Sequence, residues 1–94
     1  MRLWIDDLRV PPEKYNWIWV KNAEEAKAVI YTYELQMSDD MILIDLNADF
    51  VEILVWLKDM NIVDKGYVFK VHSTDFIARA NIEKMILKNG WRLI

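Results

Sequence analysis

Met41-Ile42-Leu43-Ile44-Asp45 is an uninterrupted apolar run that ends in an acid. Its pattern predicts a central strand buried on both faces. Two similar runs lie outside it: Arg2-Leu3-Trp4-Ile5-Asp6-Asp7 and Tyr67-Val68-Phe69-Lys70-Val71-His72-Ser73. If the three runs are parallel strands of one sheet, their carboxyl ends bring the terminal acids and polar residues to one edge. Open parallel sheets bind ligands at that edge.

Helical patterns lie between these strands. Asn22 and Glu25 form a capping-box pattern ahead of a first helix. Asp49 with Glu52 repeats the pattern ahead of a second helix, and Asp75 is the expected cap of a third. The third helix is expected to end at the glycine of residues 89–90.

Shorter segments complete the predicted topology. Residues 17–21 and 91–94 are expected to be short strands, whereas the Pro11-Pro12 pair excludes regular structure between the first two strands. The resulting order is β-β-α-β-α-β-α-β. Strands that alternate with helices predict an α/β fold with a mostly parallel sheet of about five strands, covered on both faces.

The composition indicates one globular domain over residues 1–94. An apolar content of 54% is enough for a core and disfavours disorder. The net charge of −3 provides no basic field for nucleic acid. We expect a cytoplasmic protein, because cysteine is absent, no apolar run approaches the roughly 18 residues of a membrane span, and the N-terminus has no signal-peptide pattern.

The polar strand ends resemble those of response-regulator receiver domains. In that family an acidic pair and a central aspartate hold magnesium, and the central aspartate accepts a phosphoryl group. The resemblance implies that Asp6, Asp7 and Asp45 hold Mg²⁺ or Mn²⁺. The chain departs from the family because no helix separates its first two strands and its last strand lacks the terminal lysine.

The cyclic-phosphate-processing receiver-like family is a closer match. Its opening Asp-Asp-x-Arg-x-x-Pro pattern is similar to residues 6–12. Its later His-Ser and Arg-x-Asn-Met patterns resemble His72-Ser73 and Arg79-Ala80-Asn81-Ile82, and its middle-helix tryptophan corresponds to Trp56. The resemblance covers nearly the whole chain. It implies a small three-layer, receiver-like (flavodoxin-like) fold with the first crossover helix missing.

The central strand departs from this family's pattern. The family's Leu-Asp-His-Asp-Leu-Gly is replaced by Ile44-Asp45-Leu46-Asn47-Ala48-Asp49. Leucine can neither transfer a proton nor ligate a metal, and asparagine keeps an oxygen ligand but loses a charge. The change predicts a partly degenerate active site.

The acidic candidates also have structural interpretations. Asp6 and Asp7 could end a strand and hold the next turn through backbone amides. Asp45 would be costly to bury alone, so we expect a cation or Arg9 beside it. Arg9 either neutralises the acids or binds a phosphate, since both use its bidentate geometry.

The candidates later in the chain also have both a structural and a functional interpretation. His72, the single histidine, is either a hydrogen-bonded structural residue or a general acid or base, which would make it catalytic together with Asp45. Ser73 and the residues after it either cap a helix or bind phosphate at its N-terminus. The resemblance adds Arg79 and Asn81 as phosphate-binding candidates; for Arg79 the alternative is a solvated side chain.

Five aromatic residues lie between positions 15 and 33. The simplest interpretation is that they pack in the core and at the sheet edge, and the alternative is that they form a surface that binds a partner. They are Tyr15, Trp17, Trp19, Tyr31 and Tyr33.

Two functions follow from different classes. The first is a receiver-like module with a degenerate acidic pocket that binds a small phosphorylated ligand or a protein. The alternative is a metal-dependent phosphoesterase acting on small cyclic phosphates. A phosphorelay receiver ranks third because the terminal lysine is missing, and a homodimer is left open.

Overall fold

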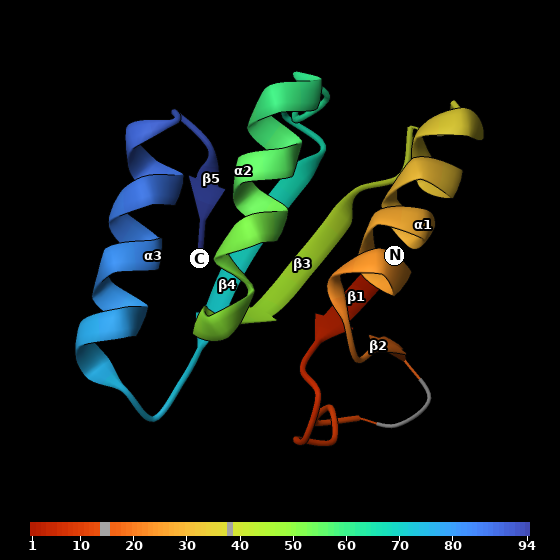
Figure 1. The fold of residues 1–94 in the computed structure, drawn as a ribbon. Helices are drawn as coiled ribbons and strands as arrows, with labels where there is room; N and C mark the ends of the chain where they lie inside the picture. The colour runs from red at the N-terminus through yellow and green to blue at the C-terminus, as the bar shows by residue number, and fades with distance from the viewer. Residues whose placement is uncertain (14–15, 38) are drawn as a thin grey trace.

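The computed structural model describes residues 1–13, 16–37 and 39–94. Strands and helices alternate in the predicted order after the first two strands (Figure 1). The strands are β1 (Arg2–Ile5), β2 (Ile18–Val20), β3 (Ile42–Asn47), β4 (Tyr67–His72) and β5 (Arg92–Leu93). The helices are α1 (Ala23–Leu35), the 3-10 turn η1 (Ala48–Phe50), α2 (Val51–Met60) and α3 (Phe76–Lys88).

The sheet is parallel throughout, in the order β2-β1-β3-β4-β5. The predicted apolar run forms the central strand β3, which pairs with β1 and β4. Residues 6–17 connect β1 to β2 and, where described, contain no helix, as the proline pair predicted. These features confirm the predicted α/β fold with the first crossover helix missing.

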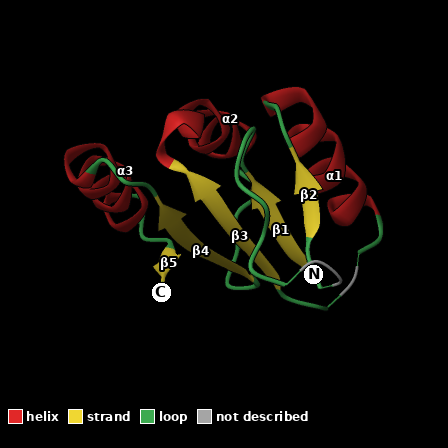
Figure 2. Ribbon diagram, turned by 90° about the horizontal axis from the view of Figure 1, so that it is seen from below, coloured by secondary structure: helices red, strands yellow, loops and turns green. Residues whose placement is uncertain are grey.

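The helices gather on one face of the sheet (Figure 2). Each helical crossover runs in the same direction across the sheet, from β2 to β3, from β3 to β4 and from β4 to β5. Because such crossovers are right-handed, all three helices must lie on the same side. The expectation of helices on both faces is therefore wrong, since the helix that would reach the other face is the missing first crossover.

Side chains along each strand alternate between the two faces of the sheet. Leu3, Ile44 and Phe69 point toward the helices and are fully buried in the core. Trp4 and Asp45 alternate with these residues and lie on the helix-free face. Part of that face is covered by the β1–β2 connection, whose Arg9 carbonyl accepts a hydrogen bond from Trp4 Nε1 at 2.8 Å.

Local signals account for most helix ends. Asn22 Oδ1 accepts from the Glu25 backbone N–H at 2.9 Å, and the Asp75 carboxylate caps α3, both as predicted. Gly90 follows α3 with a φ of 76°, a conformation that favours glycine. No described helix combines the length and apolar character needed to cross a membrane.

The expected cap at Asp49 is wrong. The N-cap residue of α2 is Phe50, which makes no side-chain cap hydrogen bond. Asn47 caps the preceding 3-10 turn η1, because its Oδ1 accepts from the Asp49 backbone N–H at 2.9 Å. The 3-10 turn η1 separates β3 from α2, so the chain turns two residues earlier than the sequence pattern indicated.

Candidate functional site

A histidine bridge joins the carboxyl ends of three neighbouring strands. His72 Nδ1 lies 2.6 Å from Asp45 Oδ1, and His72 Nε2 lies 2.8 Å from Asp6 Oδ2. Asp45 belongs to β3, His72 ends β4 and Asp6 follows β1. The predicted meeting of these side chains at one edge of the sheet is therefore observed, and Figure 1 shows the three strands side by side.

The bridge engages both ring nitrogens of His72. Asp6 and Asp45 are buried, with 1% and 3% of their surface exposed. Each of these carboxyl groups has one ring nitrogen of His72 within hydrogen-bond distance, and which atom donates depends on the tautomer. The partner beside Asp45 in this structure is therefore His72 rather than Arg9.

Asp6 is held by more than the histidine. Burial raises the pKa of its carboxyl, but hydrogen bonds from the backbone N–H groups of Arg9 and Leu8, together with His72, outweigh burial and lower the pKa below its ordinary value. Both N–H groups donate to Asp6 Oδ1 at 2.8 Å. The predicted turn-holding role of Asp6 is therefore present.

Tryptophans enclose the bridge. The Trp4 ring stacks on the His72 ring with centroids 3.9 Å apart and planes 3° apart. Trp17 meets Trp4 edge-on, and Trp19 Nε1 donates to the Asp6 carbonyl at 2.7 Å. The sequence reasoning missed Trp4, although its place two residues before Asp6 puts it on the same face of the sheet.

Part of the predicted aromatic group packs as expected. Trp17 and Trp19 are half-buried near the bridge, and Tyr33 is buried in the core. Tyr31 is exposed on α1, and Tyr15 lies outside the described residues.

Asp7 and Arg9 stand apart from the buried acids. Asp7 is exposed, and its carboxylate has no hydrogen-bond or ion-pair partner among the described residues. Arg9 Nη2 instead contacts Thr74 Oγ1 at 3.3 Å. In the described chain Arg9 therefore does not neutralise Asp6 or Asp45, because His72 occupies that position.

The remaining phosphate candidates are dispersed. Ser73 Oγ accepts from the Asp75 backbone N–H at 3.0 Å, a contact just before α3, whose capping side chain is that of Asp75. Arg79 Nε lies 3.5 Å from Glu83 Oε2. Asn81 lines a shallow groove between α2 and α3 rather than the bridge. Phosphate binding by these residues stays a prediction.

The residues that depart from the family's pattern at the end of the central strand lie in the core, beside Asp6 or on the surface. Leu46 is fully buried in the core, on the helix side of the sheet. Asn47 Nδ2 approaches Asp6 Oδ2 at 3.4 Å, a contact that the sequence reasoning did not anticipate. Asp49 is exposed, and its carboxylate has no such contact within the described ranges.

Few oxygens of the Asp6 and Asp45 carboxylates are free for Mg²⁺ or Mn²⁺ in this arrangement. These cations need several free oxygen ligands. Here Asp6 accepts hydrogen bonds on both oxygens, Asp45 accepts one from His72, and Asp7 is exposed. Among the described residues no group of three or more histidine, cysteine or acidic side chains could hold a metal ion. Metal binding by Asp6, Asp7 and Asp45 stays an untested prediction.

A small parallel sheet with acidic residues at its carboxyl edge defines a receiver-like α/β domain. The chain belongs to the family described as the cyclic-phosphate processing receiver domain, whose family model matches residues 1–88. The predicted family is thereby confirmed. No curated protein and no solved structure shows significant similarity to the chain.

Proposed function

We propose that this chain is a non-catalytic, receiver-like module that binds a protein partner. The observation that carries the proposal is the double engagement of His72, whose two ring nitrogens both contact buried carboxylates. Asp6, Asp45 and His72 would then hold three strands together rather than bind a ligand. The partner protein would bind elsewhere on the surface of the domain.

Double engagement leaves His72 without a catalytic nitrogen. A histidine that acts as general acid or base has one nitrogen oriented by the protein and the other directed to the substrate. Here neither nitrogen is available, and Trp4 covers one face of the ring. Both buried carboxyl groups have the same imidazole ring as a partner.

The metal-dependent phosphoesterase is the alternative. The contact between Arg9 and Thr74 favours it, because a guanidinium and a hydroxyl lie together on the exposed surface, close in the chain to Asp6 and His72. Such a pair could bind a small phosphate. Catalysis would require His72 to move away from at least one carboxyl group, which would leave that buried group without its partner.

Two measurements on the same protein test the proposal. Mg²⁺ and Mn²⁺ are titrated while tryptophan fluorescence is followed, because the Trp4 ring stacks on His72 and reports any opening of the bridge. A panel of cyclic phosphates is then incubated with the protein, with and without each metal. We expect no saturable fluorescence change and no hydrolysis.

Two matched variants distinguish hydrolysis by the bridge residues from hydrolysis by a contaminating enzyme. Asp45→Asn removes a bridge carboxylate, and Asp59→Asn makes the same change at an exposed position of α2. Metal-dependent hydrolysis that is lost in Asp45→Asn and kept in Asp59→Asn would overturn the proposal, provided that both variants show native circular dichroism.

A further inference from the structure

A groove lies between α2 and α3 on the helix side of the molecule. Its volume is about 370 Å³. The apolar part of its lining comes from Leu54 and Val55 of α2 and from Met85 of α3. Val55 is 50% exposed and Met85 is half-buried, so a partner can reach apolar surface in this groove. We call it the α2–α3 groove.

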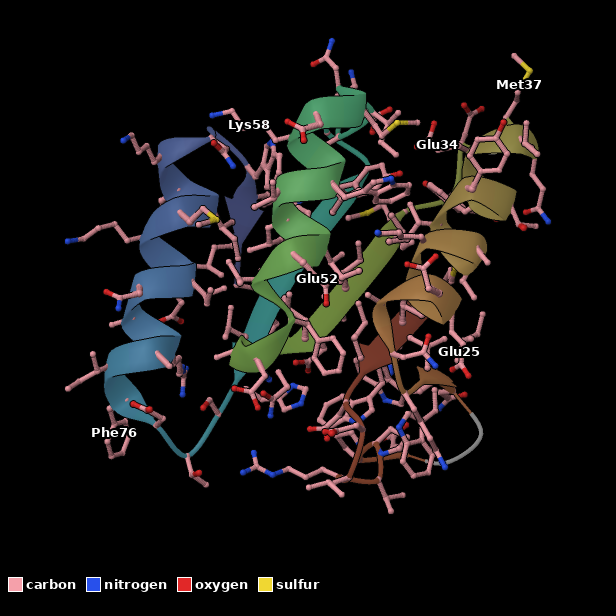
Figure 3. All side chains as sticks on the ribbon, viewed as in Figure 1. Glu25, Glu34, Met37, Glu52, Lys58 and Phe76 are labelled. Atoms are coloured by element: carbon pink, nitrogen blue, oxygen red, sulfur yellow. The ribbon has the colours of Figure 1, made fainter. Side chains whose placement is uncertain are left out.

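Three lysines surround the apolar surface. Lys58 belongs to α2, and Lys84 and Lys88 belong to α3. Figure 3 shows Lys58 on the side of α2 that faces α3. All three are exposed, and none of them forms a salt bridge within the described part of the chain. Among the described residues the lining includes one acid, Asp59, so the groove is positively charged on a chain whose net charge is −3.

The helices themselves explain only part of this positive charge. Lys58 and Lys88 lie in the last turns of α2 and α3, where a cation compensates the helix macrodipole. Lys84 lies a full turn before the end of α3, so the macrodipole does not account for it. The acid next to it in the chain, Glu83, is paired with Arg79. Lys84 is therefore available to an acidic partner.

We infer that the α2–α3 groove binds an acidic segment of a partner protein through apolar anchor side chains. The inference rests on the proposed function as a protein-binding module, and it names the surface and the chemistry of the partner. The anchors would contact Val55 and Met85, and acidic side chains beside them would meet the lysines of both helices. Lys84 and Lys88 are one turn apart on α3, so they can contact successive acidic groups.

A protein segment fits this groove better than a small molecule does. Small-molecule sites bury about 70–90% of the surface of their ligand. The α2–α3 groove is open to solvent, so a small ligand held in it would remain largely exposed. A protein segment extends beyond the groove and makes further contacts with the surrounding surface.

A second copy of this chain fits less well. A two-fold symmetric dimer brings the same surface of both copies together. Contact through the α2–α3 groove would place the three lysines of one copy against those of the other, and like charges oppose such a contact. The charge of the groove therefore favours a separate, acidic partner.

A designed peptide provides the probe. It has about 12 residues, with two leucines four positions apart and glutamates around them. Its fluorescein-labelled form is titrated with the wild-type domain and followed by anisotropy. Serine replaces both leucines in one control peptide, and lysine replaces the glutamates in another. We expect saturable binding of the acidic peptide and binding of each control that is weaker by about tenfold or more.

Variants of the domain locate the binding surface. Val55→Glu places an acid in the groove, and Val51→Glu makes the same change one turn earlier on α2, outside the lining. Lys84→Glu reverses a charge of the groove, and Lys70→Glu makes the same change at an exposed position of β4. We expect the groove variants to weaken peptide binding by about fivefold or more and their controls to change it by less than about twofold.

Several outcomes would overturn the inference. They are absence of saturable binding by the acidic peptide, equal binding of either control peptide, or equal effects of the groove variants and their controls. Octanoate is tested as a competitor, and tighter binding of octanoate than of the peptide would assign the groove to a small carboxylate instead.

Further measurements on the same samples exclude other causes. Circular dichroism and urea unfolding of each variant exclude loss of fold, and Val55→Ser provides a second change if Val55→Glu is unstable. The hydrolysis and metal assays report separately on the proposed function. Metal-dependent hydrolysis would contradict that function, whereas absence of peptide binding without hydrolysis contradicts only the role of the groove.

Discussion

Replacing His72 with alanine should destabilise the domain at neutral pH. The substitution leaves two carboxyl groups, 1% and 3% exposed, without the imidazole ring that lies between them. Asp6 keeps two backbone N–H donors, whereas Asp45 loses the hydrogen-bond partner that the described chain provides for its carboxylate. The stacking contact with Trp4 is lost as well.

The expected loss follows from burial. Removing one partner of a buried ion pair typically costs about 3–5 kcal/mol. A 94-residue domain has a total unfolding free energy of roughly 5–14 kcal/mol, so the loss is a large fraction of its stability. With urea slopes of about 1–3 kcal/mol/M, the unfolding midpoint should fall by roughly 1–5 M.

Urea unfolding followed by tryptophan fluorescence measures this loss. Lys70→Gln is the matched control, because it also removes a positive charge from β4 but at an exposed position. We expect the control to change the unfolding free energy by less than about 0.5 kcal/mol. His72→Gln retains one donor and should lie between wild type and His72→Ala, which keeps the comparison measurable if the alanine variant does not fold.

The pH dependence distinguishes an electrostatic loss from a packing loss. The pKa of Asp6 lies below its ordinary value in the folded wild type, partly because of His72. Once the pH falls through that pKa the Asp6 carboxyl is protonated, so the difference between wild type and His72→Ala should become smaller. A loss of less than about 1 kcal/mol at pH 7 would refute the bridge as a stabilising element. If the loss of unfolding free energy is the same at pH 7 and at the lower pH, the lost contact with Trp4 accounts for it instead.

Three further predictions concern other parts of the chain. The pKa of Asp6 is lower in the folded protein than in the unfolded chain. Its contribution to the stability of the fold is therefore complete above about pH 4 and is lost as the pH falls through the folded-state pKa. Below about pH 4 the unfolding free energy of Asp6→Asn in urea should depend on pH less steeply than that of wild type, and equal slopes would contradict this. Arg9→Ala removes an exposed side chain with a 3.3 Å contact to Thr74, and should change the unfolding free energy by less than about 1 kcal/mol in the same assay. Gly90→Ala should destabilise by about 1 kcal/mol because φ is 76°, although the added methyl group meets nothing within 4 Å; an unchanged thermal midpoint would count against this account.

The strand ends were predictable because their chemistry is local. Apolar runs that stop at Asp6, Asp45 and His72 mark the carboxyl ends of strands, and parallel pairing brings such ends to one edge. The side-chain caps at Asn22 and Asp75 were also readable, since each involves residues at most three positions apart.

The pairing within the site was not predictable in the same way. Whether Arg9 or His72 neutralises Asp45 depends on side-chain direction and on register across strands that are 27 residues or more apart in the chain. Arg9 is nearer to Asp6 in sequence, but the β1–β2 connection directs its guanidinium to Thr74. Asp49 does not cap α2 because β3 ends at residue 47 and a 3-10 turn capped by Asn47 lies between the strand and the helix.

The sequence by itself determined the order of the elements, the carboxyl edge and the family, because apolar periodicity, caps and short motifs act over a few residues. The tertiary structure decided which face of the sheet each element covers. Helical periodicity is the same on either side of a sheet, whereas the strand order β2-β1-β3-β4-β5 and right-handed crossovers place every helix on one side. The histidine bridge lies on the opposite side, next to the β1–β2 connection, whose backbone N–H groups donate to Asp6.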